Sequence, residues 1–232
     1  MVSKQDIMRW VALFYLIWSN LNVETSFGQN VSIDMTTERA LMSKTIPLKI
    51  EAQGSPYVQD DFESVKISGF NNQNYEARFN AYSGDMEVKI NDGSIIALDP
   101  KGNYEVTFKK DNKRYRPFTY VRSNKKEKRS YLVILYETEE FVFLKGEVVK
   151  FYDKVKANSS YQNEKPAKFQ REDDEYYLFT DDKVTYFPTN KKELAKAFPK
   201  QANGIKSFVK SEKLSYKKEA DLIKIAEFII KN

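Results

Sequence analysis

The chain has 232 residues, a formal net charge of +5, and neither histidine nor cysteine. These two missing residue types exclude a Ser-His-Asp or Cys-His nucleophile, a zinc site of the usual ligands, and a haem held by histidine or cysteine. An enzyme built from this sequence would have to use carboxylates, lysine, tyrosine or serine, as paired carboxylates do in glycoside hydrolysis.

The first 28 residues are typical of a secretory signal peptide. Lys4 and Arg9 precede an almost uncharged run at residues 10–18, and the small residue Gly28 stands just before Gln29. The apolar run has about half of the ~20 residues that a membrane-spanning helix needs, so a permanent span is the weaker interpretation. We therefore expect export to the periplasm or the extracellular space, with cleavage close to Gln29. A retained anchor or a buried N-terminal helix is the alternative.

An antiparallel β domain is expected over residues 45–187, after a lead-in at 29–44 that has no clear period. Short segments in this region alternate apolar and polar residues, which is the pattern of strands with one buried face. The 16 phenylalanines and 15 tyrosines, against 8 glycines, also favour strands. The expected strands lie at residues 45–50, 65–67, 75–79, 86–90, 94–98, 104–108, 131–136, 141–144, 148–152, 176–179 and 184–187. The run at 131–136 is the most apolar after the signal peptide and is interpreted as a central strand. Residues 156–174 are polar and are expected to form a long loop.

Turn residues separate these segments. Gly84, Gly93 and Gly102 are nine residues apart, and each stands in a tight-turn pattern where glycine can adopt a positive φ. No helix start follows any of them, so a phosphate-binding loop is not favoured. Asp181 and Asp182 mark a further turn. The sequence predicts a mainly β fold with some α, in which an antiparallel β meander forms a sheet, a sandwich or an open barrel.

Residues 188–232 have a helical period and predict two to three C-terminal helices packed on the β domain. Asn190 can cap the first helix together with Glu193, and a second short helix begins near Asn203. The last helix is expected over about residues 216–231. Its apolar stripe consists of Leu222, Ile223, Ala226, Ile229 and Ile230. The stripe is interpreted as core packing, with a membrane-surface role as the alternative.

Positive charge is concentrated in two places. Residues 109–129 contain ten lysines and arginines and only two acids, and eleven lysines stand against five acids from Lys191 onward. The region near 109–129 is a candidate surface for a glycan, a lipid headgroup or another envelope component. Nucleic acid is the least expected partner of an exported chain, and solvated turns and a lysine-rich helix face remain the simplest interpretation.

Few residues stand out as candidate site residues. The acidic clusters Asp60-Asp61 and 172–175 lack the spacing and the internal glycine of a calcium loop, so no metal or cofactor site is predicted. Aromatic side chains on a sheet could stack on sugar rings, although core or cross-strand packing explains most of them better. The aromatic candidates are Tyr57, Tyr82, Tyr115, Tyr120 and Tyr161.

Three stretches together resemble a family of exported β-rich proteins from Bacteroidota-type bacteria. They are residues 54–62 with the strands at 75–82 and 85–88, the strand pair at 143–151, and the ending at 213–224. The resemblance covers most of the chain after the signal peptide and implies export and a β-then-helix layout. The family has no established activity, so the resemblance assigns no catalytic residue.

Two classes of function remain open from the sequence. The first is a non-enzymatic binding or structural protein of the cell envelope. The second is a histidine-free, carboxylate-based polysaccharide hydrolase. A cleft with two facing carboxylates and aromatic walls would favour the hydrolase, and a filled sheet interior without such a cleft would favour the binding protein.

Overall fold

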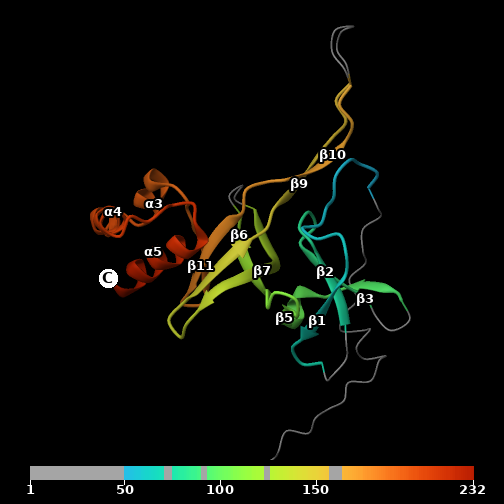
Figure 1. Cartoon of the computed structure of the whole chain (residues 1–232), viewed down its shortest axis with the longest axis horizontal. Helices are drawn as coiled ribbons and strands as arrows, with labels where there is room; N and C mark the ends of the chain where they lie inside the picture. The colour runs from blue at the N-terminus through green and yellow to red at the C-terminus, as the bar shows by residue number, and fades with distance from the viewer. Residues whose placement is uncertain (1–49, 71–74, 90–92, 123–125, 157–163) are drawn as a thin grey trace, which may run out of the picture. The chain divides into compact units, whose positions relative to one another are not determined.

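The computed structural model describes residues 50–70, 75–89, 93–122, 126–156 and 164–232 (Figure 1). The expected signal peptide at 1–28, the lead-in at 29–44 and all but the last residue of the strand expected at 45–50 lie outside these ranges. Every described residue belongs to one unit of the chain, 33–232. None of the helices among them has the length and apolar character needed to cross a membrane.

The fold is mainly antiparallel β with helices at the C-terminal end, as the sequence predicts. Ten strands form one sheet in the order β12-β11-β8-β7-β6-β5-β1-β2-β3-β4. Consecutive strands from β1 to β4 and from β5 to β8 are meanders, and the antiparallel pairing of β5 with β1 joins them. The strands are β1 (Glu63–Ile67), β2 (Tyr75–Asn80), β3 (Asp85–Lys89), β4 (Ile95–Ala97), β5 (Val106–Phe108), β6 (Arg114–Val121), β7 (Glu127–Glu137), β8 (Val142–Gly146), β11 (Glu175–Thr180) and β12 (Lys183–Phe187).

A separate two-stranded sheet corrects the long loop expected at residues 156–174. It pairs β9 (Val149–Tyr152) with β10 (Lys168–Arg171), and Val149 and Phe169 join a hydrophobic cluster of the large sheet (Figure 1). Phe169 of β10 packs on Phe151 of β9, with ring centroids 5.2 Å apart. β10 escapes sequence analysis because it has four residues and one buried side chain, too few to show a period.

The turns confirm three expectations and change a fourth. Gly84 has φ +79°, Gly93 has φ +81°, and Asp181 and Asp182 both have positive φ between β11 and β12. The turn at Gly102 is instead a 3₁₀ helix, η1 (Pro100–Gly102), and the positive φ of 55° falls on Asn103. The side chain of Asp99 accepts a hydrogen bond from the Lys101 N–H at 2.9 Å, which fixes the start of η1.

β7 is buried on both faces, in agreement with its interpretation as a central strand. Successive side chains of a strand point to opposite faces, so Tyr131 and Val133 enter one hydrophobic cluster while Leu132 and Ile134 enter another. The first cluster lies over β1, β2, β3 and β5, and the other lies over β6, β8 and β11. The sheet interior is therefore filled on both sides of its middle strands.

Three helices cover the β8, β11 and β12 end of the sheet (Figure 1). They are α3 (Lys191–Ala197), α4 (Ala202–Ser211) and α5 (Glu219–Lys231). The predicted cap is confirmed, because the Asn190 side chain accepts a hydrogen bond from the Glu193 N–H at 2.9 Å.

The apolar stripe of α5 packs into the core, as predicted. Leu222 and Ala226 are fully buried beside sheet residues such as Phe143. Ile229 is buried as well, whereas Ile223 and Ile230 are half-buried. The sequence analysis missed Ile225, which is also fully buried, because the last helix buries a wider face than the predicted stripe.

Candidate functional site

A cavity of about 170 Å³ opens between the chain at residues 58–63 and the hairpin that joins β5 to β6. The hairpin turn is fixed locally. Asn112 has φ 58°, and the Asp111 carboxylate accepts a hydrogen bond from the Lys113 N–H at 3.0 Å. This turn holds Lys110, Asp111 and Lys113 at one wall of the cavity.

Aromatic residues from three strands form the floor of the cavity. They are Phe79 of β2, Phe108 of β5 and Tyr115 of β6. The Tyr115 ring centroid lies 5.0 Å from that of Phe79 and 5.5 Å from that of Phe108. All three side chains are buried, so the floor is a fixed part of the hydrophobic core.

Glu147 fixes one side of this floor. Its carboxylate accepts hydrogen bonds from the Tyr115 hydroxyl and the Lys113 ammonium, each at 2.6 Å. Lys113 also lies over the Tyr115 ring, 5.0 Å from its centroid. Burial is the main cause that raises the pKa of Tyr115 well above its ordinary value, and the negative charge of Glu147 is the second cause. Tyr115 therefore stays a neutral donor to Glu147 at physiological pH.

The rim of the cavity is polar and partly exposed. Lys110 pairs with Glu63 at 3.1 Å, and its side chain is 73% exposed. Gln59 is exposed and brings an amide to the same rim, whereas Val58 adds an apolar side chain that is 37% exposed. The cavity thus combines an apolar floor with a few polar groups at its mouth, the usual composition of a small-ligand site.

Two carboxylates, Glu63 and Asp111, line this cavity from its two walls. Each already has a structural partner: Glu63 accepts from Lys110, and Asp111 accepts from the hairpin backbone. Among the described residues no cluster of three or more acidic side chains could hold a metal ion.

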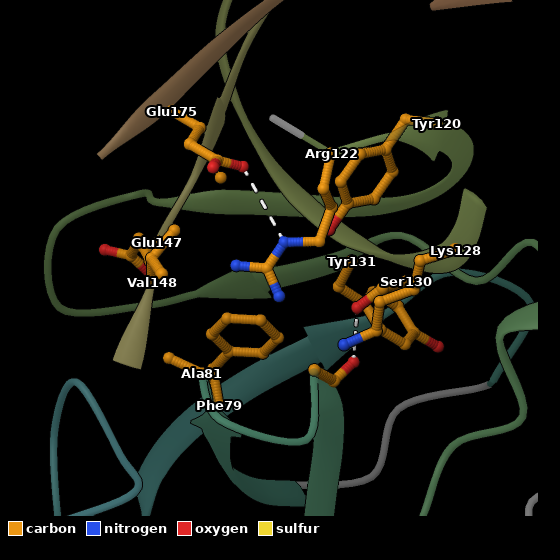
Figure 2. A pocket seen from close by; sticks show the side chains of 12 residues that line it. Phe79, Ala81, Tyr120, Arg122, Lys128, Ser130, Tyr131, Glu147, Val148 and Glu175 are labelled. Carbon is orange, nitrogen blue, oxygen red and sulfur yellow. Dashed lines mark hydrogen bonds and ion pairs between the residues drawn. The ribbon is translucent and has the colours of Figure 1, made fainter. Parts of the chain in front are cut away.

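A second, much smaller pocket is lined by two other carboxylates, those of Glu147 and Glu175 (Figure 2). Its space of about 10 Å³ is about what a single water molecule needs. Figure 2 shows the Arg122 guanidinium pointing toward Glu175, with which it pairs at 3.7 Å. Glu175 also accepts a hydrogen bond from the Tyr177 hydroxyl at 2.6 Å. Glu147 and Glu175 therefore line a pocket too small for a sugar, and both are engaged with other side chains.

The basic region at residues 109–129, interpreted from the sequence as solvated turns, instead lies mostly in β6, a strand that the sequence did not predict, and in the start of β7. Its positive charge is largely neutralised within the chain. Arg114 and Arg116 each pair with both Glu105 and Glu137, at distances from 2.6 to 2.8 Å. Lys110, Lys113 and Arg122 have the carboxylate partners already described. Lys128 and Arg129 donate to backbone oxygens, those of Ser83 at 2.6 Å and Pro100 at 3.1 Å. The positive charge that the sequence concentrates here serves mostly to hold the fold together.

The acidic clusters are engaged in local structure. The Asp60 carboxylate accepts from the Ser55 hydroxyl, and its carbonyl accepts from Arg78 at 3.1 Å. Glu172 accepts from the Tyr152 hydroxyl at 2.9 Å, and Asp174 pairs with Arg171. Residues 172–174 lie outside the strands, whereas Glu175 is the first residue of β11.

The aromatic candidates have separate roles. The Tyr57 ring stacks under Arg78, and its hydroxyl donates to Glu87. Burial is the main cause that raises the pKa of Tyr57 to about 12, and the negative charge of Glu87 is the second cause. Tyr82 is 37% exposed and packs on Phe169. Tyr120 is buried in the cluster over β8 and β11, and Tyr161 lies outside the described residues. Tyr115 alone of the four described candidates contributes to the cavity of about 170 Å³.

Sequence reasoning did not assemble this site. Its lining comes from residues 58–63, Phe79 and residues 108–115, which are distant in the sequence. Of the lining residues, the sequence indicated only Tyr115, as an aromatic candidate, and Lys110 and Lys113, as part of the basic region at 109–129. Comparison with protein-family models, curated proteins and solved structures finds no match to this chain.

Proposed function

We propose that the chain is an exported, non-enzymatic binding protein of the cell envelope, and that the cavity beside the β5–β6 hairpin takes a sugar ring of a glycan. Membership in the family of exported proteins that the sequence resembles is part of this proposal. The observation that carries the binding site is the aromatic floor of Phe79, Phe108 and Tyr115 beneath a rim of amide, ammonium and carboxylate groups. The apolar face of a sugar ring suits such a floor, and its hydroxyls suit such a rim.

The described carboxylates favour binding over hydrolysis. Hydrolysis of a glycosidic bond needs two carboxyl groups about 5 to 10 Å apart on either side of the bond. Glu147 and Glu175 line a water-sized pocket, and Glu63 and Asp111 hold Lys110 and the hairpin. A histidine-free hydrolase is the second candidate, because Glu63 and Asp111 face the same cavity.

The binding site is tested with an array of neutral oligosaccharides, followed by calorimetric titration of those retained. Val58→Phe places a ring at the mouth of the cavity and is expected to weaken binding roughly tenfold or more, about 1.4 kcal/mol. Val121→Phe is the matched control, because Val121 is 47% exposed on β6 and is not part of the lining. Equal binding by the two variants, or no retained oligosaccharide, overturns the proposal.

The same oligosaccharides separate binding from hydrolysis. We expect them to be recovered intact, with no new reducing ends after prolonged incubation. Release of reducing ends that Asp111→Asn abolishes would establish the hydrolase instead.

Export is tested by mass measurement of the chain from a secretion-competent host. An N-terminus at or close to Gln29 is expected, and an intact N-terminal segment would contradict export.

A further inference from the structure

The C-terminal segment, residues 188–232, differs from the basic region at 109–129 in how many of its charged side chains form ion pairs. It contains eleven lysines, no arginine and five acidic residues. The lysines of α3, α4, α5 and their connections are all exposed. Figure 1 shows the three helices gathered at one end of the sheet, so these lysines are gathered there too.

Three of the five acids in this segment are turned toward the protein. Glu219 of α5 pairs with Lys145 of β8 at 2.7 Å and also accepts from the Tyr176 hydroxyl. Glu227 accepts from the Tyr136 hydroxyl at 2.7 Å. Asp221 accepts from the Ser215 N–H at 2.9 Å. These carboxylates attach α5 and its preceding loop to the fold and do not neutralise the outer lysines.

One lysine of the segment, Lys196, forms an ion pair, with Glu193 at 3.1 Å. The other ten have no ion pair or side-chain hydrogen bond with any described residue. We call these ten residues the lysine surface. It consists of Lys191, Lys192, Lys200, Lys206, Lys210, Lys213, Lys217, Lys218, Lys224 and Lys231.

The kind of cation and its surroundings indicate the partner. Lysine is a point charge on a flexible stem, whereas arginine supplies the planar fork that recognises a carboxylate or phosphate of fixed geometry. The lysine surface has no arginine, and no large hydrophobic side chain of residues 188–232 is exposed. It therefore suits a partner whose negative groups can move to meet the lysines and which needs no apolar insertion.

We propose that the lysine surface adsorbs the protein to an anionic lipid bilayer, through headgroup phosphates and without entry into the hydrocarbon. A fluid headgroup layer can rearrange beneath a fixed set of ammonium groups, and each lysine near such a surface contributes to binding. The apolar stripe of α5 takes no part, because it is buried against the sheet. This adsorption is independent of the sugar-binding cavity.

The test measures sedimentation of the full chain with vesicles of neutral phosphatidylcholine and with vesicles containing anionic phosphatidylglycerol. The readout is the ratio of the two partition coefficients, in which an apolar contribution from the N-terminal segment cancels. We expect a ratio well above one that falls toward one as salt shortens the Debye length. The variant carries Lys206→Gln, Lys210→Gln, Lys224→Gln and Lys231→Gln, and should lose about five-fold per lysine, on the order of 100-fold or more in all.

A charge-matched control carries four glutamines at exposed lysines outside the lysine surface. They replace Lys66, Lys101, Lys156 and Lys183. This control should retain most of the ratio, and thermal unfolding should show that both variants fold. A ratio near one for the unaltered chain, or an equal loss in both variants, overturns the proposal. Tighter and lysine-dependent binding to a soluble acidic polysaccharide also overturns it, because that result identifies a glycan partner instead of a bilayer.

Discussion

Lys113 and Glu147 are 34 residues apart in the sequence and form an ion pair with an Nζ–Oε1 distance of 2.6 Å. The pair ties the β5–β6 hairpin to the end of β8, and the Glu147 side chain is only 4% exposed. Because Glu147 also accepts from Tyr115, one carboxylate positions both the floor and a wall of the candidate cavity.

Glu147→Gln should lower the free energy of unfolding by about 1–3 kcal/mol, since it weakens two buried charge-assisted hydrogen bonds. Urea unfolding measures this loss. Lys110→Gln is the control, because its ion pair with Glu63 is exposed and should contribute about 0–1 kcal/mol. Equal losses in the two variants would show that the Glu147 contacts do not stabilise the fold.

Buried tyrosines make the fold sensitive to alkali. The pKa of Tyr57 is raised to about 12, and burial raises that of Tyr115 well above its ordinary value. A pKa raised in the folded state contributes stability that is complete below the unfolded value of about 10 and is lost as the pH rises above it. An ultraviolet absorbance titration should show the native tyrosines ionising later than those of the urea-unfolded chain. Tyr115→Phe should reduce this lag, and titration curves that coincide would contradict the prediction.

The Arg114, Arg116, Glu105 and Glu137 network should make the fold sensitive to acid. Hydrogen bonding to Arg114 is the main cause that lowers the pKa of Glu105. A lowered carboxyl pKa contributes stability above the unfolded value of about 4.3, which is lost as the pH falls through the folded value. Glu105→Gln should therefore be less stable than the unaltered chain at neutral pH, with the difference shrinking at acid pH.

Glu76→Gln provides the matched comparison for the network. The Glu76–Lys89 pair is exposed, at 46% and 47% for the two side chains, so its removal should have little effect at any pH. Guanidinium unfolding of both variants across the acid range distinguishes them. A Glu105→Gln difference that does not change with pH would contradict the assignment.

Gly84→Ala should be destabilising by about 1–3 kcal/mol because Gly84 has φ +79° and a tight surrounding. A Cβ there would lie 2.3 Å from the hydroxyl of Ser130, which is buried and donates to the Gly84 carbonyl. Gly69→Ala is the control, because Gly69 has φ +82° but no atom of the described residues lies within 4 Å of such a Cβ. Thermal unfolding should place Gly84→Ala below Gly69→Ala, and the opposite order would refute the contact.

Leu222→Ala tests the packing of α5. Leu222 is fully buried in the helix–sheet cluster, so truncation should cost about 2–5 kcal/mol. Calorimetric unfolding should show a clearly lower melting temperature, whereas Lys224→Ala on the exposed side of the same helix should leave it nearly unchanged. An unchanged melting temperature for Leu222→Ala would mean that the stripe does not pack in the core.

Particular elements show how far sequence reasoning extends. The run at residues 131–136 predicted a central strand, and β7 is buried on both faces because both of its alternating sets of side chains are largely apolar. The apolar stripe of α5 predicted core packing because its residues recur with the period of a helix and share one face. In contrast, β10 is too short to show a period, and its pairing with β9 depends on contacts between segments that are separate in the sequence.

Composition and hydrophobic period are local properties, so they were enough to predict most of the strands, the helical ending and the chemistries that a chain without histidine and cysteine cannot use. Which charged side chains pair with one another depends on the three-dimensional fold. The ten cations of residues 109–129 and the lysines of residues 188–232 look alike in the sequence. Strand register brings Glu105, Glu137 and Glu147 beside the first group, while α5 turns its own acids inward and leaves the second group exposed. Pairing over long sequence separations is a property of the fold and is not recorded in any local pattern.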